Sequence, residues 1–532
     1  MKISVEPIGG GRRAALVVGV AVLLMLTLPV FGARARAAER IYWTNFEAGP
    51  SQSIGFANTD GTGGGALAVP TAVDPEAEQM AFDPVNGRLY VASVGAEQIL
   101  WVSLDGSGSG VVDTHGAKVL GVAGVAVDPR TQTLYWGNDA SGKAEIAWAQ
   151  LEGSASGTLN TTGATGVLPI FLALDIPDGR LYWISRDKEG GSHFSWANLD
   201  NSGGGDLTLS GTPNLEEPDG LAVDPGAGRL YWADDGGAQR IAWANLSGVG
   251  GGTVPVPGAT LIDPFGLAFD PSGGRLYWGN FGIGEQALGA LATTTLSGGG
   301  GPITPVGAPV DGPQYPLVLK SPAGTGVPQV TQNVAALSCS QGSWSQDYQG
   351  SGVFGAPISY SYQWTLNGQA ISGATGSSYT ATAGGSYSCQ VTGKNQTGSA
   401  TQASSAVTVA PAALTATLQS TKAHAKAGKA AVVKLQLANG GQIASMPVTV
   451  CAALAKAAKK ALIAPKCASI GGLGSGGSTV LALTIKTKKS AKKGTYKLTT
   501  LVNGATVAPV TVSIKVTAPK HKKKRRKHHH KK

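Results

Sequence analysis

Residues 220–248, GLAVDPGAGRLYWADDGGAQRIAWANLSG, decide the fold. Three short runs, LAVD, RLYWAD and RIAWANL, are rich in aliphatic, β-branched and aromatic residues. The segments between them contain Asp-Pro, Gly-Ala-Gly and Gly-Gly, which are turn formers. The stretch therefore predicts three short strands joined by tight turns.

The same unit recurs along the first half of the chain. Its marker is a Tyr-Trp pair, or Tyr-Val in one copy, and successive tyrosines are 48, 45, 47, 49 and 46 residues apart. A period of roughly 40–50 residues with about four strands per unit is typical of a β-propeller. Six copies predict a six-bladed propeller over residues 38–321, with these marker residues in structural positions: Tyr42, Trp43, Tyr90, Tyr135, Trp136, Tyr182, Trp183, Tyr231, Trp232, Tyr277 and Trp278.

These repeats resemble the YWTD family, the class B repeats of the low-density lipoprotein receptor. The resemblance implies six blades and covers about 280 of the 532 residues. The family's fourth motif position is Asp. Here it is occupied by residues that all accept a hydrogen bond: Asn45, Ser93, Asn138, Ser185, Asp234 and Asn280. The resemblance concerns the fold, because propellers serve as binding proteins, enzymes and scaffolds alike.

Other repeated features predict how a blade is built. A strand ending in Asp-Pro, as at Asp83 or Asp224, precedes the Tyr-Trp strand in the later copies, with Asp175 followed by Ile176-Pro177, and Asp before Pro is an ordinary turn former. A third strand carries one aromatic residue, for which we expect core packing between blades rather than sugar stacking. The first copy lacks an Asp-Pro strand, and Tyr315–Pro322 resembles the missing one. We expect this segment to complete blade one and close the ring.

Residues 1–37 have the features of an export signal. Arg12 and Arg13 precede an apolar run, and Ala35-Arg36-Ala37 offers a cleavage site. The apolar run of 18 residues also leaves an uncleaved membrane anchor open. We expect an extracellular protein that is secreted or associated with the cell wall or surface.

Residues 322–409 resemble the immunoglobulin-like modules of bacterial surface proteins. Cys339, Trp364 and Cys389 are spaced by 25 residues each, and Tyr387 lies two residues before the second cysteine. This resemblance implies a disulfide between two sheets, with the Trp packed on it and a tyrosine corner. Residues 410–517 alternate apolar and polar residues and predict a second β-sandwich of the same general kind. Four cysteines allow three pairings, of which one pair per module, with Cys451 joined to Cys467, is the simplest.

Charge divides the chain sharply. Residues 39–347 contain 31 Asp and Glu against 12 Lys and Arg, whereas residues 348–532 contain 25 Lys and Arg and no acidic residue. The tail, 518–532, has no core-forming residues and predicts disorder. We expect it to contact an anionic cell-envelope polymer or lipid; greater solubility and attraction to the acidic propeller are the alternatives. The contact residues would be Lys522, Lys523, Lys524, Arg525, Arg526 and Lys527.

No catalytic or metal-binding motif stands out, and no cofactor is implied. His115 and His193, the two propeller histidines, belong to no recognisable triad or ligand spacing. Six-bladed propeller hydrolases such as gluconolactonases hold calcium in the central channel with an irregular set of Glu, Asn and Asp, and no departure from the repeat indicates such a set here. We expect a monomeric binding or adhesion protein whose propeller takes an unknown protein or glycan ligand; the alternative is a propeller-type hydrolase or lyase with its active site in the central channel. Loops that differ between blades are the first places to look: Arg186–Glu189, Glu216-Glu217, Asp234-Asp235 and Glu285.

Overall fold

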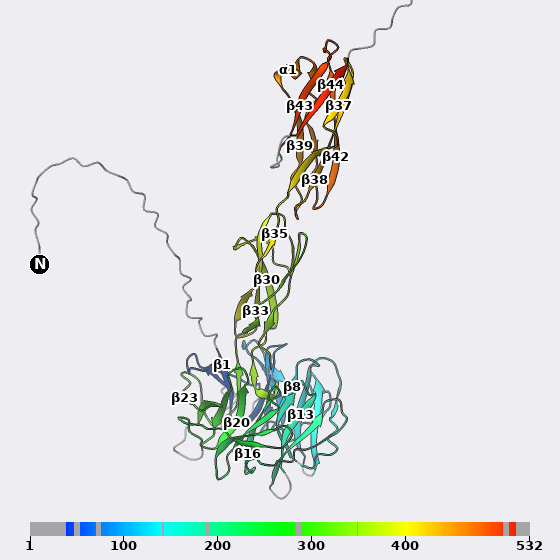
Figure 1. Ribbon diagram of the computed structural model, residues 1–532. Coiled ribbons are helices and arrows are strands. Elements are labelled where there is room, and N and C mark those ends of the chain that lie inside the picture. Colours follow the sequence, from blue (N-terminus) through cyan, green and yellow to red (C-terminus); the bar gives the residue numbers. More distant parts are fainter. Residues whose placement is uncertain are drawn as a thin grey trace, which may run out of the picture. The chain divides into compact units, whose positions relative to one another are not determined.

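The fold comes from a computed structural model of the chain (Figure 1). It describes residues 39–46, 54–70, 76–140, 143–166, 168–186, 191–282, 289–347, 349–503 and 510–517. The expected export signal at 1–37 and the expected cationic tail at 518–532 lie outside these residues. The protein is an all-β protein, as expected. No helix in the described part is long and apolar enough to cross a membrane.

The first half forms a β-propeller of six antiparallel sheets, and neighbouring innermost strands contact one another around the ring. The strands of each blade are given from the innermost outward. Blade one is β24 (Pro313–Leu319), β1 (Arg40–Asn45), β2 (Ile54–Asn58) and β3 (Gly65–Leu67); blade two is β4 (Ala77–Asp83), β5 (Arg88–Ser93), β6 (Gln98–Ser103) and β7 (Ser109–Val111); blade three is β8 (Val125–Asp128), β9 (Thr133–Ala140), β10 (Lys143–Gln150) and β11 (Ser156–Thr158). Blade four is β12 (Leu168–Asp175), β13 (Arg180–Arg186), β14 (Ser192–Asn198) and β15 (Gly204–Asp206); blade five is β16 (Pro218–Asp224), β17 (Arg229–Asp234), β18 (Arg240–Asn245) and β19 (Gly251–Thr253); blade six is β20 (Pro264–Asp270), β21 (Arg275–Asn280), β22 (Ala290–Thr295) and β23 (Gly301–Ile303).

The ring is closed by its last strand. β24 pairs antiparallel with β1, with Val318 opposite Ile41 and Leu317 opposite Tyr42. The predicted closure of blade one by the segment near Tyr315 is therefore confirmed. Because β24 follows five complete blades in the sequence, this pairing joins the two ends of the propeller and leaves blade one no unpaired inner edge.

The two kinds of repeated tryptophan occupy different environments. Those of the Tyr-Trp strands are core residues, at most 1% exposed: Trp43, Trp136, Trp183, Trp232 and Trp278. The third-strand aromatics are half-buried and, as expected, pack between blades, each against an apolar core cluster that joins two neighbouring blades: Phe56, Trp101, Trp148, Trp196 and Trp243. In four blades an arginine also covers the ring, as Arg229 covers Trp243 at 4.2 Å.

Polar repeat positions hold the turns together. The fourth motif position accepts backbone N–H groups from the loop before its blade, as Asn138 Oδ1 does from Leu120 at 3.1 Å and Asn280 Oδ1 from Ile262 at 3.1 Å. The Asp-Pro aspartates accept N–H groups of their own turns, as Asp83 does from Val85 at 2.9 Å. Both sets therefore satisfy backbone donors at the ends of strands.

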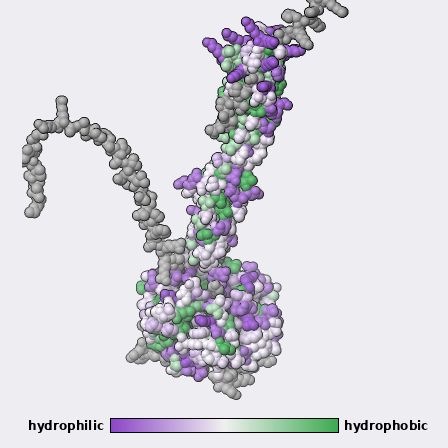
Figure 2. All heavy atoms as spheres, in the orientation of Figure 1, coloured by the Kyte–Doolittle hydropathy of each residue, from purple (hydrophilic) through white to green (hydrophobic). Residues whose placement is uncertain are grey.

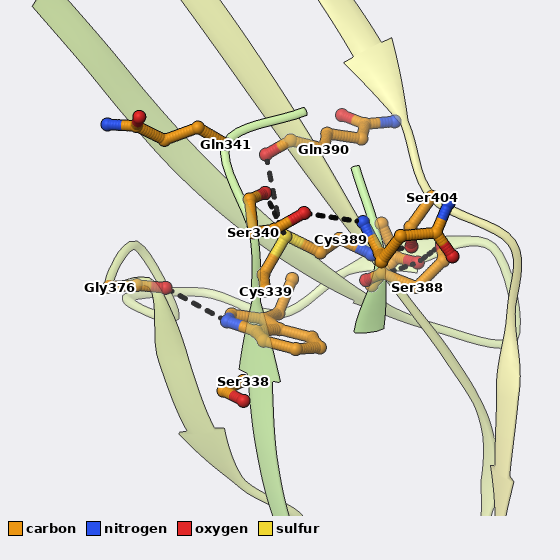
Figure 3. The surroundings of a disulfide bond; sticks show 12 residues. Ser338, Cys339, Ser340, Gln341, Gly376, Ser388, Cys389, Gln390 and Ser404 are labelled. Atoms are coloured by element: carbon orange, nitrogen blue, oxygen red, sulfur yellow. Dashed lines mark hydrogen bonds between the residues drawn. A yellow bond between two sulfur atoms is a disulfide. The ribbon is translucent and has the colours of Figure 1, made fainter. Parts of the chain in front are cut away.

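A first C-terminal module follows the propeller. Its Cys339–Cys389 disulfide spans 50 residues. Figure 3 shows this bond, and beside it Gly376 accepts a hydrogen bond from Trp364 Nε1 at 2.9 Å. Tyr387 is fully buried and donates its hydroxyl to Ala383 O at 2.8 Å. The elements are β25 (Gly324–Gly326), β26 (Val330–Asn333), β27 (Ala336–Cys339), β28 (Ser343–Trp344), η1 (Gln349–Ser351), β29 (Val353–Phe354), β30 (Ser359–Leu366), β31 (Gln369–Ala370), β32 (Ser378–Thr380), β33 (Gly385–Lys394), β34 (Ser399–Ala403) and β35 (Val407–Val409).

A second C-terminal module consists of two sheets, of strand order β36-β38-β42-β40 and β37-β44-β43-β39-β41, around one apolar core. Cys451 pairs with Cys467, so both expected disulfides are present. The elements are β36 (Leu414–Leu418), β37 (Lys422–Lys426), β38 (Ala430–Asn439), β39 (Val448–Leu454), α1 (Lys456–Lys459), β40 (Leu462–Ile463), β41 (Ala468–Ile470), β42 (Ser478–Thr487), β43 (Gly494–Asn503) and β44 (Val510–Thr517).

Candidate functional site

The six innermost strands run in the same direction around the central channel. Five of them finish at the repeated aspartates, and we call this side the Asp-Pro end. The opposite side, where the strands begin, is called the entrance end. The two ends differ in what occupies them.

The first C-terminal module closes the Asp-Pro end. Its β29 pairs in parallel with β24 and thereby becomes a fifth strand of blade one. The Phe354 ring lies 5.0 Å from that of Phe82, and Phe354 is 3% exposed. A Cβ at Gly350 would lie 2.5 Å from the carbonyl oxygen of Leu174, so only glycine fits there. The segment 349–354 is therefore packed into the propeller as part of its core.

Large side chains fill the middle of the channel. Gln79 links three innermost strands, because its Nε2 donates to Leu172 O and its Oε1 accepts from the N–H groups of Val125 and Leu172. Only a small cavity of about 40 Å³, bordered by Gln79, Tyr315 and Gly350 among others, separates these side chains from segment 349–354. That volume holds a water molecule or two and no larger ligand. A ligand of the propeller axis must therefore bind at the entrance end.

At the entrance end the blades stop resembling each other. Five innermost strands change register there, between five and three residues before the Asp-Pro aspartate or its equivalent. Two positions of this stretch can be compared between blades, the first lying five residues and the second four residues before that aspartate. The first position holds Glu78, Ala123, Ile170, Asp219, Phe265 and Gln314. The second holds Gln79, Gly124, Phe171, Gly220, Gly266 and Tyr315.

Carboxyl groups gather at this end. Asp219 is 4% exposed and accepts a hydrogen bond from Arg186 Nη2 at 2.9 Å. Burial, strengthened by the neighbouring Asp235, raises the pKa of Asp219 even though Arg186 opposes the shift. Burial also raises the pKa of Asp235, whose Oδ1 has no hydrogen-bond partner within the described residues. The two carboxyl groups interact, and one shared proton would relieve their repulsion.

Glu78 adds a third carboxyl group. Burial raises the pKa of Glu78 to about 7, against a lowering influence from the Tyr315 hydroxyl. Glu78 Oε2 and Tyr315 Oη are buried, and neither makes a hydrogen bond of regular geometry with a described residue. Gln314 Oε1, on a side chain 3% exposed, also lacks a partner there. Buried polar groups are rarely left unpaired, and the described residues provide no partner for these atoms.

An aromatic group adjoins the carboxyl groups. The Tyr315 ring lies 5.1 Å from Phe171 and 5.6 Å from Phe265. Phe265 in turn lies 6.0 Å from Phe281, which contacts Phe46 at 5.9 Å. Phe46, Phe265 and Phe281 are partly exposed. A few polar groups converging beside aromatic rings are typical of ligand-binding sites.

The chemistry of this site favours positive charge. Arg186, whose side chain is 43% exposed, pairs with Asp219 and also influences Glu78, while Asp235 interacts with Asp219. A cation beside them would favour the ionised carboxylates and lower their pKa values, and aromatic faces also attract cations. Among the residues that the structure describes, no set of three or more His, Cys, Asp and Glu side chains is arranged to hold a metal ion.

Sequence reasoning found part of this site. Arg186 and Asp235 belong to the predicted loops, and Glu217 lies near enough to raise the pKa of Asp235. Asp234 instead holds its own loop through Glu217 N and Arg240, while residues 187–189 and Glu285 lie outside the described residues. His115 and His193 contact Gln150 O and Asp206, and not the cluster.

Four residues of the cluster were missed: Glu78, Asp219, Gln314 and Tyr315. The sequence prediction for the channel covered only a calcium-binding set of carboxylates and amides, and the irregular positions of the innermost strands were not considered as a polar cluster of another kind. The available signal was the position five residues before each Asp-Pro aspartate, which varies while its neighbours repeat.

The fold has counterparts among solved structures. A nidogen/laminin complex matches 49% of this chain and 90% of its own at 19% identity and a TM-score of 0.39. TolB from Acinetobacter baumannii matches 53% and 66% at 15% identity and 0.40. A gluconolactonase from Xanthomonas campestris matches 56% and 94% at 16% identity and 0.35. These similarities agree with a β-propeller and carry no argument about function. No protein-family model and no curated protein matches the chain.

Proposed function

We propose that the protein is an exported binding protein whose propeller takes its ligand at the entrance end. One observation carries the proposal: three carboxyl groups and unpaired buried oxygens converge beside aromatic rings at the end left open by segment 349–354. Segment 349–354 closes the Asp-Pro end and side chains fill the middle of the channel, so a ligand on the propeller axis would bind at the entrance end.

The ligand that suits this site carries a positive charge next to an apolar group. Among the described residues, burial and neighbouring carboxyl groups outweigh Arg186 at Glu78 and Asp219, and the Phe265 and Phe281 rings offer an apolar wall. An amine or guanidinium group of a protein or glycan partner would replace water at the carboxylates. Its neighbouring carbon atoms would lie on the rings.

The rest of the chain fits a protein of the cell exterior. Two disulfides agree with an oxidising compartment. We infer that the propeller belongs with YWTD repeats, that the two C-terminal modules are immunoglobulin-like spacers, and that the signal at 1–37 directs export. The cationic tail would attach the protein to an anionic envelope polymer or lipid.

The test uses the full chain on an array of basic peptides, acidic peptides and glycans. Basic members should bind best, and the double variant Glu78→Gln/Asp219→Asn should bind them about 30-fold or more weakly, as expected for loss of buried charge partners. The double variant Asp105→Asn/Asp200→Asn removes the same charge from exposed turns and should bind normally. Preference for acidic members, or equal losses in both variants, would contradict the proposal.

Binding should also release protons. A cation beside Glu78 lowers its pKa from about 7, so that calorimetry at pH 7 should show proton release into the buffer. Glu78→Gln should abolish that component. Uptake of protons on binding would show that the ligand is an anion.

An enzyme acting at the same place is the second candidate, because a carboxyl group with a pKa near 7 can give and take protons at neutral pH. The array separates the two functions. Time-dependent conversion of a bound member, lost in the Glu78→Gln variant, would establish a hydrolase or lyase, whereas unchanged recovery of the ligand supports binding.

A further inference from the structure

The second C-terminal module carries many lysines and no counter-charges. Its described residues contain 15 lysines, all exposed, and the chain has no Asp or Glu after Asp347. Lysines on ordinary surfaces alternate with acidic residues, which limits any single-sign field. Here nothing within the module neutralises them.

The lysines are distributed unequally over the two sheets. On the outer face of β37, β44 and β43, Lys422 and Lys497 both align with Ser513, and Lys515 pairs with His424. Lys426 continues the β37 row. Intervening residues such as Ala425, Ile514 and Leu498 point into the core. On the outer face of β38 and β42, by comparison, only Lys434 and Lys486 are charged. We call Lys422, Lys426, Lys497 and Lys515 the lysine face.

A second group of lysines lies at one end of this face. The turn at Gly428 donates its N–H to Lys488 O, and Lys488 N donates to Ala461 O just after α1. These hydrogen bonds place the turn at Gly428, the turn at Lys488 and the residues just after α1 next to one another. Ala427 N bonds to Thr517 O at the end of β44, so the last described residue of the chain lies at the same end. Figure 2 shows hydrophilic side chains gathered there, and the lysines involved are Lys429, Lys459, Lys460, Lys488, Lys489, Lys492 and Lys493.

We propose that the lysine face binds a linear phosphodiester polymer through the charges of its backbone. The inference goes beyond the propeller site and does not depend on it. Neighbouring strands lie about 4.8 Å apart and alternate residues along a strand about 6.7 Å apart, so the face presents a flat, closely spaced array of ammonium groups. Each contact with a phosphate releases a counterion, which gives affinity that falls with salt.

The composition of the face argues for backbone recognition of a soluble polymer. It has lysines and no arginines, so it lacks the bidentate donors that read base edges. Tyr496 is packed against the core and is not a stacking platform. Between the lysines lie His424 and Thr495, without a large apolar side chain that would insert into a membrane. Glycerol-phosphate polymers and nucleic acids share the required phosphodiester chain.

The experiment compares two double variants in the full chain. Lys422→Gln/Lys515→Gln removes two charges from the lysine face, and Lys434→Gln/Lys486→Gln removes two from exposed strand positions of the other sheet. Binding to poly(glycerol phosphate), to an oligo-dT strand and to vesicles containing phosphatidylserine is measured as a function of salt. Since every protein keeps the same tail, any tail contribution stays constant.

The lysine-face variant should lower the slope of log affinity against log salt by about 1.4, or about 0.7 for each lost phosphate contact. The control should retain the original slope, and the two polymers should bind equally per phosphate. Equal effects of both variants, or no effect of either, would overturn the proposal by assigning binding to net charge or to the tail. Preference for vesicles over both polymers, or for oligo-dT over poly(glycerol phosphate), would overturn it as well.

Discussion

The two ends of the innermost propeller strands are built on opposite principles. At the Asp-Pro end the same aspartate recurs, and its carboxylate accepts N–H groups of the following turn, as at Asp83 and Asp128. At the entrance end the position five residues before the end of each innermost strand differs in every blade, and Glu78 and Tyr315 keep buried oxygens without a regular partner among the described residues. Repetition marks the residues that build the propeller. Departures from it include Gln79, which links three innermost strands, and residues such as Glu78, whose buried oxygen lacks a regular partner and which are candidates for function.

The largest effect is expected at Gly266, where the innermost strands β20 and β24 come close together at the entrance end. Gly266 has φ +65°, and a Cβ there would lie 2.2 Å from Tyr315 N. Gly266→Ala should lower the free energy of unfolding by about 3–5 kcal/mol, combining the left-handed backbone with overpacking. Urea unfolding of the full chain measures the loss.

Gly228 is the matched control. It has a similar φ of +61°, but a Cβ at this residue would meet no atom within 4 Å. Gly228→Ala should therefore cost only about 1–2 kcal/mol from backbone strain. Equal losses in the two variants would mean that the close approach of β20 and β24 does not constrain the ring.

The sequence predicted what repeats and missed what does not. The propeller and its closing strand followed from the spacing of Tyr42 to Tyr277, because periodic core positions are set by local packing that each blade repeats. The packing of the third-strand aromatics between blades was also predicted, but the pattern did not reveal that an arginine covers the Trp243 ring. The carboxyl cluster was invisible for a physical reason. Glu78 and Asp219 are 141 residues apart and meet only when the ring closes.

The pH dependence of stability should also differ between the two ends. The folded-state pKa of Glu78, about 7, lies above the usual 4.5, so the folded protein binds the proton more tightly than the unfolded chain does. Its contribution is therefore fully present below pH 4.5 and is lost as pH rises to about 7, by at most about 3 kcal/mol. Glu78→Gln should remove this part of the decline, as urea unfolding at pH 5 and pH 8 would reveal.

An aspartate of the other end provides the contrast. Asp83 accepts hydrogen bonds from Val85 N at 2.9 Å and from Asn86 Nδ2 at 2.8 Å. Asp83→Ala should therefore cost about 1–3 kcal/mol already at pH 5, where Glu78→Gln has little effect. If Glu78→Gln lowered the free energy of unfolding at pH 5 more than Asp83→Ala does, the Glu78 carboxyl group would be needed for the fold and would not be a group reserved for a ligand.

The smallest effect concerns the arginines that cover the third-strand rings. Arg229 lies 4.2 Å from the centre of the Trp243 ring in blade five, whereas in blade six Thr293 replaces the aromatic residue and Arg275 only reaches its Oγ1 at 3.4 Å. Arg229→Met should lower the free energy of unfolding by about 0.5–1 kcal/mol, the usual value of a cation–π contact at a partly exposed site. Arg275→Met should cost less, because no ring is lost. A double-mutant cycle with Trp243→Leu isolates the contact and should return a coupling of similar size. A coupling near zero, or an equal cost at Arg275, would show that Arg229 stabilises the protein through contacts other than the one with the Trp243 ring. In that case the aromatic ring would recur in the blades because of its packing, for example against Gly252, and not because of the arginine.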